Sequence, residues 1–163
     1  MTVIWITGLP GAGKTTAAHA VATRLRAQGA TCIILDGDAL REALSPLGAG
    51  YDPESRRRLA MTYSGIALLL SEQGLSVIVA TVSLFAAVHA ANRRRFRRYI
   101  EVLLTCDEGE RNRRRPPVAA QWPVRDLAVE LPTSPHLTID TNACDPDNIA
   151  AQIVGLAAGS PAE

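Results

Sequence analysis

The sequence predicts an α/β fold of three layers (α/β/α), in which helices cover both faces of a five-stranded parallel sheet. Short apolar runs rich in Val and Ile alternate with longer segments that have helical periodicity. The apolar runs carry few polar positions, which is typical of strands buried on both faces. A glycine-rich stretch, residues 8–15, joins the first such run to the first periodic segment. In this architecture, ligands bind beyond the carboxyl ends of the strands.

The individual elements follow from composition and spacing. Gly29 and Gly74 stand where helices are expected to end, and Pro53 stands where a long helix is expected to begin. The predicted strands are residues 2–7, 31–35, 75–80, 100–105 and 136–139, and the predicted helices are residues 14–28, 53–74 and 145–158.

Length and composition indicate one domain. With 163 residues, of which 47% are hydrophobic, the chain can bury a continuous core without disulfides or structural metals. We expect a single domain over residues 1–158, with a proline-rich lid at about 111–135 and a flexible tail at 159–163.

Charge and cysteine usage exclude several classes of partner. The net charge is +1, and the arginine clusters lack the interleaved aromatic residues of a nucleic-acid surface, so neither nucleic acid nor a membrane is expected as a partner. The three cysteines are scattered and not at metal-ligand spacing, and the first apolar run is too short for a signal or a membrane span. We therefore expect a reduced, cytoplasmic protein.

The segment Gly8-Leu9-Pro10-Gly11-Ala12-Gly13-Lys14-Thr15 matches the phosphate-binding loop (P-loop) pattern G-x-x-x-x-G-K-[ST]. Glycines let backbone N–H groups converge on phosphate oxygens at the start of a helix, whose positive end favours an anion. Lys14, the only lysine of the chain, is expected to bridge the terminal phosphates during catalysis. The motif predicts ATP and Mg²⁺ as cofactors. The candidate nucleotide-binding residues are Gly8, Pro10, Gly11, Ala12, Gly13, Lys14, Thr15 and Thr16, with Thr15 also a Mg²⁺ ligand.

Two acids at the end of the second predicted strand favour a kinase. Asp36 and Asp38 fall on the same sheet edge as the P-loop, where a carboxylate can organise Mg²⁺, directly or through water, and accept a proton from an acceptor hydroxyl. The alternative is that Asp36 or Asp38 only caps the following helix. A regulatory GTPase is disfavoured, because its Asn-Lys-x-Asp motif needs a second lysine. These features together predict the P-loop kinase version of the α/β fold, with a short lid.

The chain resembles the adenylylsulfate (APS) kinase family over most of its length. The resemblance is carried by the P-loop and by the run Leu35-Asp36-Gly37-Asp38-Ala39-Leu40-Arg41, and it continues through residues 74–79, 83–85, 92–93, 99–102 and 137–141. It implies ATP-dependent phosphorylation of a hydroxyl on a small anionic or nucleotide-linked metabolite, as when adenylylsulfate becomes 3'-phosphoadenylylsulfate. Many members of the family are homodimers, so the resemblance also implies a homodimer here.

The resemblance also assigns roles to individual residues. Asp38 corresponds to the catalytic carboxylate, which we expect also to bind Mg²⁺. The expected substrate contacts are Asp36, Arg41, Arg56, Ser83, Phe85 and Arg93. In the lid region, an arginine such as Arg113 can reach the transferring phosphate or stack on adenine, the alternative being a solvated basic loop.

Departures from the family pattern fall mainly on the acceptor side. Met61-Thr62 stands where relatives carry paired arginines, and Ser83-Leu84-Phe85-Ala86 replaces a Ser-Pro-Phe/Tyr-Arg segment. Two alternatives therefore stay open. One is a kinase for a different capsule or specialised-metabolite precursor, similar to a divergent branch that acts on cytidine diphosphoramidate. The other is a nucleotide-binding module without turnover.

Overall fold

The computed structural model describes residues 1–47, 50–114 and 129–159 and contains one parallel sheet in the order β2-β3-β1-β4-β5. The five predicted strands are confirmed to within a residue at each end. They are β1 (Val3–Thr7), β2 (Cys32–Asp36), β3 (Ser76–Ala80), β4 (Tyr99–Thr105) and β5 (Leu137–Asp140). The helices of the described residues are α1 (Lys14–Ala27), α2 (Gly37–Ala43), α3 (Pro53–Glu72), α4 (Ala86–Arg95), α5 (Glu108–Arg114) and α6 (Pro146–Gly159), with a short 3-10 turn at Ser45–Leu47.

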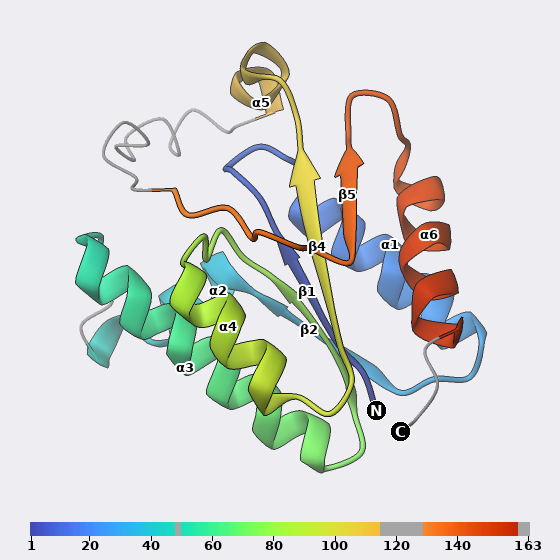
Figure 1. The fold of residues 1–163 in the computed structure, drawn as a ribbon, viewed down its shortest axis with the longest axis horizontal. Coiled ribbons are helices and arrows are strands. Elements are labelled where there is room, and N and C mark those ends of the chain that lie inside the picture. The colour runs from blue at the N-terminus through green and yellow to red at the C-terminus, as the bar shows by residue number, and fades with distance from the viewer. Residues whose placement is uncertain (48–49, 115–128, 160–163) are drawn as a thin grey trace.

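Side chains alternate between the two faces of the sheet and divide the core in two. Ile4 and Ile6 of β1 pack with α1 and α6, whereas Trp5 faces α3 and α4. Figure 1 shows these helix pairs on opposite sides of the sheet. Trp5 is fully buried, as expected for a strand covered on both faces.

Strand β1 holds the centre of the sheet. Val3 is in register with Val77 of β3 on one side and with Tyr99 of β4 on the other. The chain therefore reverses its direction of strand addition at β1, and the loop that follows this strand opens at the crevice where such sheets bind ligands.

The long helix α3 begins at Pro53, as the sequence predicts, and ends at Glu72, two residues before the predicted terminator Gly74. The Asp52 side chain accepts a hydrogen bond from the Ser55 N–H (2.9 Å), and Pro53 occupies the first turn. Gly74, with φ of 87°, follows the helix end in the left-handed conformation that favours glycine. Among the described residues, no helix is both long and apolar enough to cross a membrane.

The proline-rich stretch 111–135 differs from the expected loop at its start, and most of it, residues 115–128, lies outside the described residues. Arg111 to Arg114 form the last turn of α5, because Asp107 caps this helix by accepting from the Glu110 N–H (2.8 Å). Residues 160–163 of the predicted tail also lie outside the described part.

Candidate active site

The P-loop closes tightly between β1 and α1. Gly11 has φ of 82°, and a Cβ there would lie 2.4 Å from the Arg111 carbonyl oxygen, so only glycine fits. Gly13 begins α1 in the left-handed conformation, with φ of 84°. The Lys14 ammonium folds back over the loop and donates to the Leu9 carbonyl (3.0 Å). The loop is thus shaped around a space at the amino end of a helix, where an anion is favoured.

The pKa of Lys14 differs from that of a surface lysine. Burial lowers the pKa of Lys14 to about 8, an effect that Asp38 and Asp36 oppose and Arg111 reinforces. An anion placed in the loop would reverse this shift by stabilising the ammonium form.

Asp36 links the end of β2 to the P-loop. One carboxylate oxygen accepts from the N–H groups of Asp38 (2.9 Å) and Ala39 (3.4 Å), which caps α2. The other oxygen accepts from the Thr15 hydroxyl (2.7 Å). Helix capping is therefore a real role of Asp36, but it uses only one side of the carboxylate, and the other side meets the residue predicted to hold Mg²⁺.

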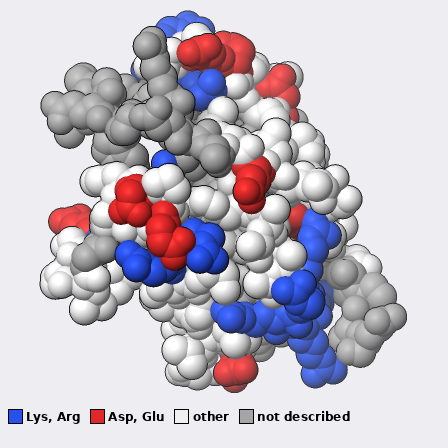
Figure 2. Space-filling view, turned by 60° about the vertical axis from the view of Figure 1, so that its left-hand side comes forward, with Lys and Arg blue, Asp and Glu red and all other residues white. Residues whose placement is uncertain are grey.

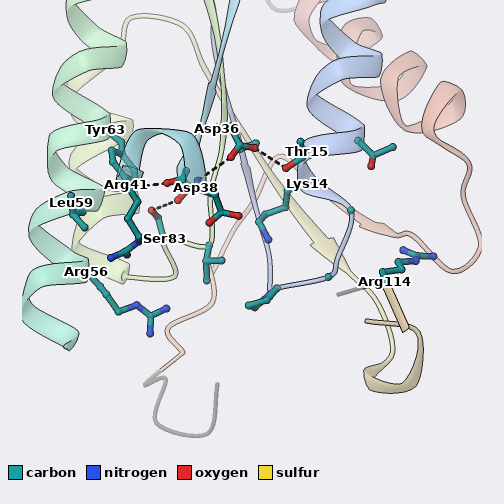
Figure 3. Close-up of a pocket in the computed structure, with 18 of the residues that line it drawn as sticks. Lys14, Thr15, Asp36, Asp38, Arg41, Arg56, Leu59, Tyr63, Ser83 and Arg114 are labelled. Carbon is teal, nitrogen blue, oxygen red and sulfur yellow. Dashed lines mark hydrogen bonds between the residues drawn. The ribbon is translucent and has the colours of Figure 1, made fainter. Parts of the chain in front are cut away.

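Asp38 projects into the cavity from the first turn of α2 (Figure 3). Burial and the neighbouring Asp36 raise the pKa of Asp38, and Lys14 and Arg41 act against that rise. A carboxylate whose pKa is raised towards the working pH is a better proton acceptor than an ordinary aspartate.

A cavity of about 370 Å³ joins the P-loop to α2, α3 and the loop after β3. Figure 3 shows Lys14 and Thr15 facing Asp36 and Asp38 across it, with Arg41, Arg56 and Tyr63 on the α2–α3 side. The lining residues are Pro10, Gly11, Gly13, Lys14, Thr15, Thr16, Asp36, Gly37, Asp38, Arg41, Arg56, Leu59, Tyr63, Ala80, Thr81, Val82, Ser83, Phe85 and Arg114.

Two arginines give the α2–α3 side a positive charge. Burial and the proximity of Arg41 lower the pKa of Arg56, so the two guanidinium groups act on each other. Arg41 donates to the Gly50 carbonyl (2.8 Å), and its guanidinium carbon lies 4.6 Å from the centre of the Tyr51 ring. This pair suits an anionic group, because an anion between the two cations would relieve their repulsion.

The loop after β3 completes the wall beside Asp38. Thr7 donates its hydroxyl hydrogen to the Val82 carbonyl (3.0 Å), and the hydroxyls of Thr81 and Ser83 share a hydrogen bond of 2.9 Å. A Cβ on Gly37 would lie 2.9 Å from the Thr81 hydroxyl, so the start of α2 packs closely on this loop.

Most of the predicted site residues meet at this cavity, but four do not line it. Gly8 and Ala12 lie behind the lining: a Cβ on Gly8 would lie 2.4 Å from the Leu104 carbonyl oxygen, and Ala12 is fully buried. Arg113 points away, with its side chain 77% exposed and paired with Glu110.

Arg93, the fourth, has a side chain that is 37% exposed and covers a buried cluster between α4 and β4. Its guanidinium binds Glu101, whose side chain is fully buried and also bonds to His89 Nδ1 (2.8 Å) and accepts from the Tyr99 hydroxyl (3.0 Å). Burial alone would raise the pKa of Glu101, but the hydrogen bonds with His89, Arg93 and Tyr99 outweigh it and lower the pKa. Arg93 thus holds the fold together at this point and stands apart from the cavity.

From the run of arginines at 113–115, the sequence prediction selects Arg113, whereas the structure brings Arg114 to the cavity. Its guanidinium donates to the Thr141 hydroxyl (3.0 Å) and carbonyl (3.2 Å), and Nε binds Glu110 (2.8 Å), which holds it beside Gly13 at the cavity wall. The run of arginines at 113–115 carried the signal, but only the helical phase of α5 shows which of them turns inward.

Three further arginines lie away from the cavity. Arg94, Arg95 and Arg97, at the end of α4 and in the turn before β4, are exposed. Figure 2 shows a group of Lys and Arg side chains on the surface at the lower right of the view. Since β4 starts at Tyr99, this turn lies at the amino-terminal edge of the sheet, opposite the P-loop edge. These arginines take no part in the cavity.

The donor set fits a hard cation held jointly with phosphate. The Thr15 hydroxyl and the carboxylates of Asp36 and Asp38 are the kind of oxygen ligands that Mg²⁺ prefers. Within the described residues, no cluster of three or more His, Cys, Asp or Glu side chains forms a cage for a metal. Mg²⁺ usually binds through one or two carboxylates together with substrate phosphates, which matches so few protein ligands.

The sheet order, the P-loop and the facing carboxylates define a P-loop kinase, an ATP-dependent phosphotransferase. The comparisons with known proteins agree with this class. The family model described as adenylylsulphate kinase matches residues 1–117, and the chain belongs to that family.

Individual relatives agree with the family. An adenylyl-sulfate kinase of Pseudomonas aeruginosa is 36% identical over 93% of this chain and 83% of its own length. The cytidine diphosphoramidate kinase of Campylobacter jejuni is 39% identical over 66% of this chain and 62% of its own length. Among solved structures, the Mycobacterium tuberculosis APS kinase in complex with AMPPNP and APS superposes with a TM-score of 0.85 at 25% identity, covering 97% of this chain and 98% of that one.

Proposed function

We propose that this protein transfers the γ-phosphate of ATP to a hydroxyl of an anionic, nucleotide-linked acceptor. Adenylylsulfate, converted to 3'-phosphoadenylylsulfate, is the first candidate. The observation that carries the proposal is the single cavity in which the P-loop faces Asp38 on one side and the arginine pair Arg41 and Arg56 on the other. Donor phosphates and a charged acceptor can therefore meet beside one carboxylate.

The cavity residues divide the work of phosphoryl transfer. Lys14 and the loop N–H groups hold the ATP phosphates, and Thr15, Asp36 and Asp38 hold Mg²⁺, with carboxylate contacts direct or through water. Mg²⁺, when bound, neutralises charge on the phosphate oxygens. Asp38 accepts the proton of the acceptor hydroxyl. Arg41 and Arg56 bind the acceptor's anionic group, which offsets its repulsion from ATP.

A second acceptor, cytidine diphosphoramidate, is favoured by two observations. The relative that phosphorylates it is 39% identical to this chain. In addition, Leu59 and Tyr63 bring apolar surface to the cavity on α3, next to the Met61-Thr62 pair that replaces the paired arginines of APS kinases. On this side the cavity wall therefore differs from the APS kinase pattern.

The test is an ADP-release assay with adenylylsulfate, with cytidine diphosphoramidate and with simple hydroxylated metabolites, each compared with the Asp38→Asn variant. Turnover on adenylylsulfate alone supports the first candidate, and turnover on the cytidine compound alone supports the second. No turnover on any acceptor, together with measurable ATP binding, would refute the kinase proposal in favour of a nucleotide-binding module.

Some finer points belong to the same proposal. We expect the enzyme to act in the cytoplasm and to form a homodimer, which light scattering would test. A hexameric APS kinase of Thiobacillus denitrificans has a similar fold, with a TM-score of 0.72 at 25% identity, so larger assemblies are the alternative outcome of that measurement. We also propose Arg113 as a nucleotide contact, which would require its ion pair with Glu110 to open.

A further inference from the structure

Glu130 joins a distant part of the chain to the loop that carries Ser83 and Phe85. Its backbone N–H donates to the Leu84 carbonyl (3.1 Å), and its carboxylate accepts from the Ala86 N–H (2.6 Å). These two hydrogen bonds lie on either side of Phe85 in the sequence. Glu130 therefore binds the loop on both sides of Phe85, a residue of the cavity wall.

Helix α4 has no cap of its own at the end that Glu130 contacts. Phe85 occupies the N-cap position and has no side-chain oxygen to accept from the first N–H groups of the helix. The Glu130 carboxylate supplies that acceptor, and its negative charge also suits the positive end of the helix. A residue far away in sequence thus performs the capping that Ser, Thr, Asp or Asn usually performs locally.

The opposite end of the same loop is held independently. The Thr7 hydroxyl binds the Val82 carbonyl, and the Thr81 hydroxyl binds that of Ser83. Ser83 and Phe85 therefore stand between two anchors, of which the β1 side is buried and the Glu130 side is exposed.

We propose that Glu130 is a positioning residue for the acceptor side of the active site: it fixes the loop from Ser83 to Phe85 against the start of α4, so that both side chains face the bound acceptor. This inference rests on the proposed function, since it assigns the loop to the acceptor. Glu130 is not among the residues that line the cavity and acts only through the loop.

The segment that carries Glu130 has other attachments, so removal of the carboxylate should not release it. Arg93 donates to the Ser134 carbonyl, and the His136 N–H donates to the Glu101 carbonyl (2.9 Å). These contacts, together with β5, fix the following residues. A Glu130→Ala change is therefore expected to loosen the loop and leave the fold intact.

The experiment compares steady-state kinetics of the wild type, Glu130→Gln, Glu130→Ala and the control Glu72→Gln, which alters an exposed carboxylate at the far end of α3. Loss of one charge-assisted hydrogen bond at an exposed site predicts a rise of about three- to tenfold in the acceptor KM for Glu130→Ala. The rise should be smaller for Glu130→Gln, which keeps an acceptor oxygen. The ATP KM and the control should not change. An unchanged acceptor KM, or equal changes in both KM values, would overturn the proposal.

Amide hydrogen exchange separates a failure of this inference from a failure of the proposed function, because it needs no turnover. In Glu130→Ala, a peptide that contains Ala86 should exchange faster than in the wild type, while peptides of β1 and α1 exchange at the same rate. If the wild type has no activity with any acceptor but this difference is present, the proposed function fails and the contact stands. No difference at Ala86 would refute the role of Glu130 directly.

Discussion

The lowered pKa of Lys14 leads to a quantitative prediction about nucleotide binding. With a pKa of about 8, Lys14 is about 90% protonated near pH 7 and about 10% protonated near pH 9. An ordinary lysine, with a pKa of about 10.4, would stay more than about 95% protonated over that range. If nucleotide phosphates bind only the ammonium form, the apparent affinity for ADP should fall about tenfold between these two pH values.

The direction of this pH effect on ADP affinity follows from the linkage between proton binding and phosphate binding. Bound phosphate stabilises the charged lysine, so binding takes up a proton wherever the free protein has already lost it, and affinity must fall as pH rises through about 8. The phosphates of ADP, whose last pKa lies near 6, are already ionised above about pH 7, so they add little to the slope.

Calorimetric titration with ADP at constant ionic strength measures this effect. Lys14→Arg is the matched control, because a guanidinium keeps its charge throughout the range and should give a nearly flat profile. A flat profile in the wild type, or the same slope in Lys14→Arg, would show that Lys14 does not titrate as the structure implies.

Three further predictions concern single side chains. Asp38→Asn should lower kcat by about a hundredfold or more while ATP still binds. The wild-type kcat should fall as pH drops through the raised pKa of Asp38, since only the carboxylate accepts a proton. Steady-state ADP-release assays measure both effects, and a retained kcat in the variant would exclude Asp38 as the base. Arg56→Ala should raise the acceptor KM about tenfold or more through loss of a charge-assisted contact, with no change in ATP KM, so an effect on ATP instead would move Arg56 to the donor side. Arg93→Ala should reduce the free energy of unfolding by about 1–2 kcal/mol. The buried carboxylate of Glu101 loses its guanidinium partner but keeps His89 and Tyr99, and Arg93 itself is 37% exposed. Urea denaturation measures the loss, and a stable variant with a raised acceptor KM would restore the substrate role expected from the sequence.

The residues predicted for the donor side lie together in the structure because they are contiguous in the sequence. Gly11, Gly13, Lys14 and Thr15 carry the positive φ angles and polar groups that the P-loop pattern requires, and the motif spacing alone fixes them relative to one another. Strand assignments succeeded for a similar reason, since strands buried on both faces stand out as apolar runs.

The rest of the site depends on which distant residues the fold brings together, and sequence patterns carry little of that information. Arg113 and Arg114 are neighbours with the same chemistry, and the phase of a short helix decides that Arg114 faces the P-loop. The resemblance predicts an acceptor contact for Arg93, but the fold pairs it with the buried Glu101 on β4, whose position the sequence pattern does not reveal. The sequence offers capping as an alternative to a site role for Asp36, whereas in the structure one carboxylate oxygen caps α2 and the other accepts from the Thr15 hydroxyl.

The central position of β1 has a consequence for synthesis of the protein. Of the five strands, β1 is synthesised first, yet its two neighbours begin only at Ser76 and Tyr99. Until both have emerged, the P-loop has no sheet beneath it, and ATP has no preformed site on the nascent chain. Non-local pairing of this kind slows folding. Nucleotide should therefore stabilise the finished protein but not a nascent chain that lacks β3 and β4.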